Sequence, residues 1–321
     1  MPNFNGVWSL TTQAQYASDW PFGVPFPMGV FMGGAGSAGN VISSLNISTL
    51  GNSDNSFGTL STSKEQCTTV GSNTHAFRMG GDGNVDSIFR VAYTTGGSAT
   101  DYADLAVGVR YHGGFGNATR GFALGGSHAG SANGYNNIQL FLYDSTGDAT
   151  DFGDMSTTAY YVNGSSNSTR GLYNLAALNN GSTARSDTIE YITLASAGNG
   201  TDFGNLTTTR RRVASTSSAT RTLFGGGDTS SAIVNTIDYV TTASTGNATD
   251  FGDLSTARNR LPAVASTTRG VFAGGYGSSS EDVTIDYVTI ASTGNATDFG
   301  DMSTNHYEMS GGASSASAAV S

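Results

Sequence analysis

The sequence predicts an all-β fold made of repeated blades, and three observations support this prediction. Gly accounts for 45 of the 321 residues, about twice the usual share, and it separates short runs of Tyr, Phe, Val and Ile. Only 12% of the residues are charged, unlike in charge-rich disordered chains. One stretch recurs almost unchanged, as TIDYVTTASTGNATDFGDLS at 236–255 and TIDYVTIASTGNATDFGDMS at 284–303. Such recurrence is the signature of a repeat architecture.

The recurring stretch has six copies along the chain. Weaker copies begin at Asn137 and Thr188, and two degraded copies begin at Ser43 and Ser87. A second element, of the type TRGVFAGG, precedes each copy. Its equivalent positions are 28, 75, 120, 170, 221 and 269, which are 45 to 51 residues apart. Because a four-stranded blade needs roughly 40–50 residues, the repeat predicts a six-bladed β-propeller of four-stranded antiparallel blades.

Each unit holds four segments with strand character, which read GVFAGG, TIDYVTI, TDFGDLS and RLPAVAS in the clearest copies. The second and third are joined by S-T-G-N, where Gly and Asn tolerate a positive φ. The longer segments do not alternate cleanly between apolar and polar residues, which we expect of blades that neighbours cover on both faces. We attribute the paired glycines to close approach of the backbones at the axis, where the blades converge.

The two ends of the repeat array predict how the ring closes. The first unit opens directly at GVFMGG, whereas the last carries an additional segment, NHYEMSGGAS, that aligns with ARNRLPAVAS at 257–266. A C-terminal strand near Tyr307–Ser314 should therefore complete the first blade and close the ring, which removes exposed sheet edges. We assign residues 28–315 to the propeller and residues 316–321 to a C-terminal tail.

Residues 1–27 differ from the repeats and are assigned to a short N-terminal arm. They contain both tryptophans and four of the five prolines. Two alternatives stay open. The arm is either a flap that covers apolar surface of its own propeller or a docking arm for a larger assembly, since Trp and Phe are typical of buried interface centres. In the second case the contact residues are Phe4, Trp8, Trp20, Phe22 and Phe26.

Bulk properties exclude several classes of partner. The formal net charge is −10 and the pI is about 4.6, which disfavours nucleic acid because phosphate binding relies on a basic surface. No stretch approaches 18 apolar residues, so we expect no membrane insertion. The N-terminus lacks the pattern of a secretory signal. The run Arg210–Arg212 is interpreted as a solvated basic spot.

Two repeated sets of charged residues are candidates for ligand binding. The T-D-F-G-D segments place two carboxylates three residues apart, as in Asp250 and Asp253, which suits calcium or simply Asx-turns. A second set occupies one repeat position and predicts a partial ring that either recognises an acidic ligand or pairs with Asp of adjacent blades. This set consists of Arg120, Arg170, Arg221 and Arg269. The four histidines and Cys67 show no metal or nucleophile pattern, so we expect no metal, no cofactor and no catalytic residue.

The unit resembles the kelch repeat over about residues 28–315. The matching features are the glycine pairs, such as Gly274–Gly275, the Tyr143–Asp144 element, the Phe152–Met155 segment and the basic residue after it, as at Arg258. Phe or Tyr stands where kelch third strands usually have Trp. More specifically, IDYVTTASTGNATDFGDLSTAR with RGVFAGG resembles repeats in virion proteins of marine and cyanobacterial phages, and FNGVWSLTTQAQ resembles the start of such proteins.

This resemblance implies a structural protein of a phage virion, in a tail fibre, a spike or elsewhere on the particle surface, that mediates assembly or host-surface attachment. Its expected partners are other virion proteins, bound through the arm, and a host surface glycan. The alternative is a stand-alone carbohydrate-binding propeller, a lectin or adhesin. A kelch-type enzyme is the third alternative, and it would need an asymmetric polar cluster at the mouth of the ring.

Overall fold

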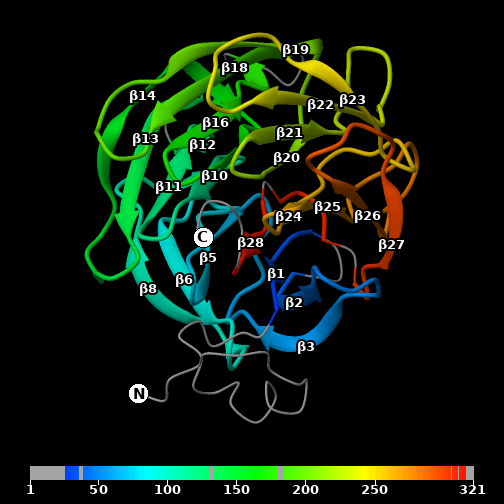
Figure 1. Ribbon diagram of the computed structural model, residues 1–321. Coiled ribbons are helices and arrows are strands. Elements are labelled where there is room, and N and C mark those ends of the chain that lie inside the picture. Colours follow the sequence, from blue (N-terminus) through cyan, green and yellow to red (C-terminus); the bar gives the residue numbers. More distant parts are fainter. Residues whose placement is uncertain are drawn as a thin grey trace, which may run out of the picture.

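The computed structural model describes residues 26–35, 39–129, 134–178, 184–304, 306–309 and 311–315. These residues form strands and turns without a helix, and the strands build six small antiparallel sheets arranged as a six-bladed β-propeller (Figure 1). The predicted fold class is therefore confirmed.

The first three blades have the following strands, from the axis outward. Blade 1 contains β28 (Ala313–Ser314), β1 (Met28–Met32), β2 (Val41–Asn46) and β3 (Asp54–Thr59), with the short β7 (Gly97–Ser98) beside β3. Blade 2 contains β4 (Thr68–Gly71), β5 (His75–Met79), β6 (Ser87–Ala92) and β8 (Thr100–Asp104). Blade 3 contains β10 (Gly113–Gly116), β11 (Arg120–Leu124), β13 (Tyr135–Leu142) and β14 (Thr150–Tyr160), with β17 (Ala177–Leu178) at its outer end.

The last three blades follow the same order. Blade 4 contains β15 (Asn163–Ser166), β16 (Arg170–Asn174), β18 (Ser186–Thr193) and β19 (Thr201–Arg210). Blade 5 contains β20 (Ala214–Ser217), β21 (Arg221–Gly225), β22 (Thr236–Thr241) and β23 (Thr249–Asp253). Blade 6 contains β24 (Ala263–Ala265), β25 (Arg269–Ala273), β26 (Thr284–Thr289) and β27 (Thr297–Asp301). A separate two-stranded ribbon joins β9 (Val109–Arg110) to β12 (Ser127–His128).

The ring closes as the sequence predicts. The C-terminal strand β28 pairs antiparallel with β1, with Ser314 opposite Gly29 and Ala313 opposite Val30, and the two lie side by side in Figure 1. The Ser315 amide also donates to the Met28 carbonyl at 3.0 Å. Strand β28 thus supplies the innermost strand of the first blade, so the inner edge of β1 is paired.

Each blade is buried between two neighbours. The second strands, such as β1 and β11, are buried over nearly their whole length. The apolar clusters lie between the sheets, where, for example, the Phe115 ring of blade 3 stacks against the Tyr173 ring of blade 4 with centroids 6.3 Å apart. Burial on both faces explains why these strands do not alternate between apolar and polar residues.

The paired glycines do not line the axis, so that part of the sequence interpretation is wrong. They lie at the ends of the second strands, where Gly274 and Gly275 have φ of 56° and 109°. A Cβ on Gly275 would lie 2.8 Å from the carbonyl oxygen of Asn259 in the connection that enters the blade. The glycines are thus needed for a left-handed turn and a close approach away from the axis. The axis itself is surrounded by the innermost strands.

Antiparallel strand order gives the propeller two different faces. The crossover face carries the connections from the outermost strand of one blade to the innermost strand of the next, together with the glycine-pair loops between second and third strands. The hairpin face carries the turns between first and second strands and the S-T-G-N loops. The chain enters the ring at Met28 and leaves it at Ser315, both on the hairpin face.

The repeated G-N-A segment holds neighbouring blades together at the rim. In the pair formed by blades 4 and 5, the amides of Gly246 and Ala248 donate to the carbonyls of Phe203 and Asn205 at 2.7 Å each. The Asn247 side-chain oxygen accepts from the Asn205 amide at 3.1 Å. The loop of each blade therefore covers the exposed edge of the preceding outer strand. We call this arrangement the rim clasp.

Candidate functional site

One position of every blade combines a large polar or aromatic side chain with a left-handed backbone. It lies on the crossover face, in the connection that leads from the outermost strand to the innermost strand of the next blade. We call its six residues the mouth ring, and their φ angles lie between 54° and 61°. They are Gln66, Tyr111, Tyr161, Arg212, Arg260 and Glu308.

This backbone conformation is unfavourable for a residue with a Cβ, by roughly 1–2 kcal/mol. Apart from Asn84, every other described residue with a φ in the left-handed region is a glycine. Among the described residues, the left-handed positions outside the mouth ring are therefore held by glycine or by Asn84, whereas the mouth ring retains large side chains. Strained non-glycine residues of this kind cluster at binding and catalytic sites. The mouth ring is our candidate functional site for this reason.

Backbone hydrogen bonds join mouth-ring residues of successive blades. The Tyr111 amide donates to the Gln66 carbonyl at 2.9 Å, and the Tyr161 amide donates to the Tyr111 carbonyl at 2.8 Å. The Gln66 amide in turn donates to the Glu308 carbonyl at 2.7 Å, across the point where the ring closes. Because these bonds link equivalent residues of adjacent blades, the six residues encircle the axis closely. Their side chains are held in place by the propeller as a whole.

The side chains form two groups around the axis. The Tyr111 and Tyr161 rings have centroids 4.6 Å apart, and Arg212 lies 4.4 Å from the Tyr161 centroid and donates to its hydroxyl at 3.0 Å. In the other group, Arg260 pairs with Glu308 at 2.7 Å. The ring surrounds a cavity of about 20 Å³, which is room for roughly one water molecule. Larger ligands would therefore lie on the mouth ring and not inside it.

Tyr111 and Glu308 of the mouth ring have shifted pKa values. Burial, together with the nearby Tyr161 and Glu308, raises the pKa of Tyr111 to about 12. Burial also raises the pKa of Glu308, although Arg260 and Arg212 act in the opposite direction. At neutral pH Tyr111 is thus a protonated phenol that can donate a hydrogen bond.

Three arginines converge on one carboxylate beside the mouth ring. Asp228, in the glycine-pair loop of blade 5, lies 2.7 Å from Arg185, 3.1 Å from Arg211 and 3.5 Å from Arg212. Asn259 donates to the same carboxylate at 3.2 Å. We call the three guanidiniums and Asp228 the arginine cluster.

The arginine cluster corrects the interpretation of Arg210–Arg212 as a solvated spot. Arg210 is completely buried and pairs with Asp238 at 2.8 Å, whereas Arg211 and Arg212 are mostly buried against Asp228. A run of like charges suggested solvation, but the tight turn between blades directs these side chains to different carboxylates of blade 5.

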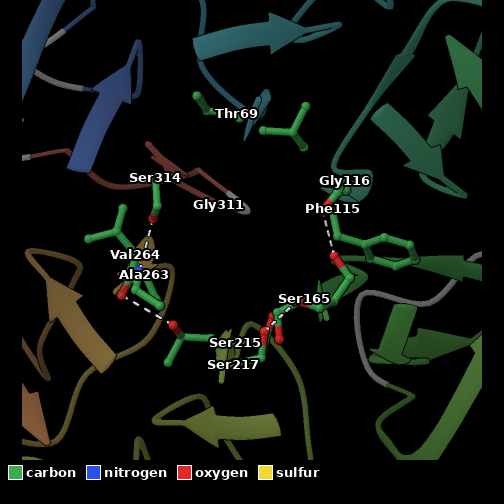
Figure 2. Close-up of a pocket in the computed structure, with 18 residues that line it drawn as sticks. Thr69, Phe115, Gly116, Ser165, Ser215, Ser217, Ala263, Val264, Gly311 and Ser314 are labelled. Carbon is green, nitrogen blue, oxygen red and sulfur yellow. Dashed lines mark hydrogen bonds between the residues drawn. The ribbon is translucent and has the colours of Figure 1, made fainter. Parts of the chain in front are cut away.

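The axis of the propeller holds a second, larger cavity. A cavity of about 60 Å³ is lined by the innermost strands of all six blades, and Figure 2 shows these residues arranged around it. Hydroxyl groups link adjacent strands along its wall. Ser166 donates to the Gly116 carbonyl and Ser217 to the Ser166 carbonyl, each at 2.7 Å. The small, hydroxyl-rich wall holds the inner strands together, and the cavity has room for only a few water molecules.

The predicted arginine ring lies on the hairpin face, opposite the mouth ring, and each of its members has a protein partner. Arg120, Arg170, Arg221 and Arg269 donate to backbone carbonyls of the next blade at 2.6–3.0 Å. Three of them also cover a tyrosine of their own blade, as Arg221 covers Tyr239 at 4.6 Å. A contact between blades accounts for the repetition of these arginines without a ligand, and their role in acidic-ligand binding stays a prediction.

Of the predicted docking residues, Phe4, Trp8, Trp20 and Phe22 lie outside the described residues. Phe26 is described, and it packs half-buried against the apolar cluster between blades 1 and 2. This contact of the described end of the arm is the one expected of a flap.

The remaining candidates occupy structural positions. His306 is buried, with Nδ1 2.6 Å from the Gly33 carbonyl and Nε2 2.7 Å from Ser43 Oγ. Cys67 is buried and reduced, and burial raises the pKa of its thiol. In the described ranges, no three His, Cys, Asp or Glu side chains come together as a possible metal site. The same ranges contain no helix long and apolar enough to cross a membrane.

Comparison with protein-family models and with curated proteins found no match. The six-bladed architecture is thus established by the structure, and the kelch-like and phage resemblance depends on the sequence motifs alone.

The mouth ring was not predicted from the sequence. Its residues have no common chemistry, and positive φ angles in Gln, Tyr, Arg and Glu leave no compositional signal. A usable signal did exist, because each mouth-ring residue follows the aromatic residue of its outer strand at the same interval. At this position the residue type differs between blades that are otherwise similar. The symmetric propeller therefore has an asymmetric surface at the mouth ring.

Proposed function

We propose that this protein is a structural component of a phage particle, a propeller in a tail fibre, a spike or elsewhere on the particle surface that mediates assembly or attachment to the host surface. The arm attaches the propeller to other particle proteins, and the crossover face is directed toward the host. The resemblance of the repeats to virion proteins supports the viral part of this proposal.

The positions of the first and last strand residues of the propeller support the proposed orientation. Phe26, Met28 and Ser315 lie together on the hairpin face, where Met28 and Ser315 are joined by hydrogen bonds. The mouth ring lies on the opposite face. Attachment through the arm therefore leaves the strained mouth-ring residues free for a second contact. The proposal depends mainly on this observation, that the arm joins the hairpin face whereas the mouth ring lies on the crossover face.

The test is mass spectrometry and immunogold labelling of particles purified from cultures that produce the protein. We expect the full chain in the particles, and we expect a chain lacking residues 1–25 to fold with an unchanged melting temperature but to be absent from them. Absence of the full chain from every particle fraction would refute the proposal. Equal incorporation of the shortened chain would refute the role of the arm.

A stand-alone carbohydrate-binding propeller is the second candidate, and the mouth ring favours it. Tyr side chains next to Arg, Glu and Gln offer both apolar ring faces and hydrogen-bonding groups, the combination found in small-molecule sites. Glycan binding by a protein that never associates with particles would identify this alternative.

A further inference from the structure

We propose that the axis of the propeller binds a column of ordered water molecules, which act as hydrogen-bond partners for buried polar atoms of the surrounding strands. The column occupies the cavity inside the mouth ring, which we call the mouth cavity, and the axial cavity shown in Figure 2. This inference concerns the interior of the ring and is independent of the proposed function.

The two cavities lie one behind the other along the axis. Gln66 lines the mouth cavity, and Thr69, further along the same segment, lines the axial cavity. In the same way, Asn163 of β15 lines the mouth cavity and Ser165 of β15 lines the axial cavity. Because residues of an extended strand are only about 3.3 Å apart, the two cavities adjoin. With volumes of about 20 and 60 Å³, they have room for one water molecule and for a few, respectively.

Buried polar atoms without a partner line both cavities. Five such atoms, all of them inaccessible to solvent, have no hydrogen-bond partner among the described residues. They are Gln66 Oε1, Arg212 Nε and Arg260 Nε at the mouth cavity, and Thr69 Oγ1 and Ser165 Oγ at the axial cavity. An unpartnered buried polar atom is strongly unfavourable, and a buried water molecule typically bonds to about three such atoms. The linings therefore have the chemistry of a water site.

The packing of the blades does not require the two axial hydroxyl groups. The strand registers show that Ala263 of blade 6 occupies the position of Thr69, and Ala313 of blade 1 that of Ser165. Alanine at these positions leaves no polar side-chain atom to be satisfied. In addition, the innermost strand of each blade has a partner strand on one side only, so backbone groups of its other edge face the axis. Thr69 and Ser165 thus add hydrogen-bonding capacity to a wall that is already polar.

The local charges favour water over an ion. Among the described residues that line the axial cavity, none has a charged side chain. At the mouth cavity, Arg260 pairs with Glu308 at 2.7 Å, and Arg212 lies 3.5 Å from Asp228. An ion would lose its hydration shell in the cavity without an opposite charge to compensate the loss. A water molecule both donates and accepts hydrogen bonds, as these linings require.

The direct test is a crystal structure of the full-length protein at atomic resolution. We expect water molecules within about 3.2 Å of Thr69 Oγ1, Ser165 Oγ and Gln66 Oε1. Crystals soaked in sodium bromide and in rubidium chloride test the ionic alternatives by anomalous scattering. An anomalous peak in either cavity, or the lack of electron density beside all three atoms, would overturn the inference.

Two variants test the water column in solution through the sign of their effect. Thr69→Val and Ser165→Ala remove the axial hydroxyl groups with little change of shape. If water bonds to them, each variant should lower the melting temperature by about 2–4 °C, the effect of losing one hydrogen bond in a chain of this size. Removal of a hydroxyl group that has no partner would instead leave the melting temperature unchanged or raise it.

Thr289→Val is the matched control, because Thr289 lies in strand β26 with its side chain exposed. We expect little change of the melting temperature in this variant. An unchanged or raised melting temperature in both axial variants would overturn the inference, and so would an equal decrease in Thr289→Val. Either axial variant is sufficient for the comparison should the other fail to fold.

Discussion

A single repeat position shows how individual residues join neighbouring blades. In two interfaces a fully buried arginine of one blade pairs with an aspartate of the next at 2.8 Å, as Arg258 does with Asp286. At the ring closure His306 and Ser43 occupy the same two positions. Blade 3 has Ala159 at the position of the arginine, so Glu190 of blade 4 has no ion-pair partner there. Glu190 instead accepts a hydrogen bond from the Tyr173 hydroxyl at 2.8 Å. The chemistry of the contact varies while its location is maintained.

We expect different effects on stability from removing two buried arginines. Arg258→Met leaves the buried Asp286 without its ion-pair partner and should lower the free energy of unfolding by about 3–5 kcal/mol. Arg78 is 1% exposed, forms no ion pair with a described residue, and its Nε and Nη1 have no hydrogen-bond partner there. Arg78→Met should therefore be neutral or stabilising. Urea unfolding of both variants is the measurement, and a larger loss in Arg78→Met would contradict this account.

Acid should weaken the ring closure through His306. Burial lowers the pKa of His306 to about 4, against about 6.5 for an exposed histidine. The unfolded chain then binds the proton more readily, so stability is complete above about pH 6.5 and falls as the pH drops toward 4, by about 3 kcal/mol for this residue. His112, with a pKa of about 3, adds in the same direction.

The measurement for this prediction is the melting temperature as a function of pH. His306→Asn removes the titrating group, so its melting temperature should depend less on pH than that of the unchanged protein over the range from about 6.5 to about 4. An identical pH dependence in the two proteins would exclude His306 as a cause.

At the scale of the element, the rim clasp explains two features of the repeat. The Asn of G-N-A caps the preceding outer strand, and the Gly of F-G-D provides the space for this approach. A Cβ on Gly153 would lie 2.4 Å from the Gly198 carbonyl oxygen. Blade 2 has Ala103 at this position, and its clasp is made by Ala149 and the Asp148 side chain. The outer edges, the usual sites of aggregation, are thus covered within the ring.

Gly153→Ala should destabilise the protein by about 1–3 kcal/mol, because the new methyl group overlaps backbone and the φ of 152° is unfavourable for alanine. Gly198→Ala is the matched control on the opposite side of the same clasp, where a Cβ meets nothing within 4 Å. We expect little change in that variant. Thermal unfolding compares the two, and equal effects would mean that the clasp is not the cause.

At the scale of the whole molecule, stability depends on closure of the ring. Strand β28 completes the sheet of blade 1, and Met309 belongs to the apolar cluster between blades 6 and 1 together with Phe31, Val271 and Met302. Both blades lose a packed face if this segment is removed. The C-terminal segment therefore stabilises the entire ring and not merely its last blade.

Deletion of residues 305–321 should lower the melting temperature by at least about 10 °C or prevent soluble expression, given roughly 2–4 °C per kcal/mol in a domain of this size. Deletion of residues 316–321 leaves β28 in place and is the control. A melting temperature unchanged by the longer deletion would show that closure is dispensable.

The sequence by itself determined the all-β class, the six blades, the order of their strands and the closing C-terminal strand. These features follow from repeats, short apolar runs and turn residues, which are local properties of a chain. The first repeat lacks its innermost strand and the last repeat is followed by an additional one. This difference was enough to predict β28 as the innermost strand of blade 1.

Only the tertiary structure decided where the surface becomes asymmetric. Arg185, Arg212 and Asp228 come from separate connections, and Glu308 and Gln66 meet only because the ring closes. The arginines that recur at one repeat position in the sequence, such as Arg170 and Arg221, join neighbouring blades. A residue that recurs in every blade is expected where all blades make the same packing contact. The mouth ring could not be recognised in the sequence, because its residues differ in chemistry and share only a positive φ angle. The geometry of the closed ring imposes this angle.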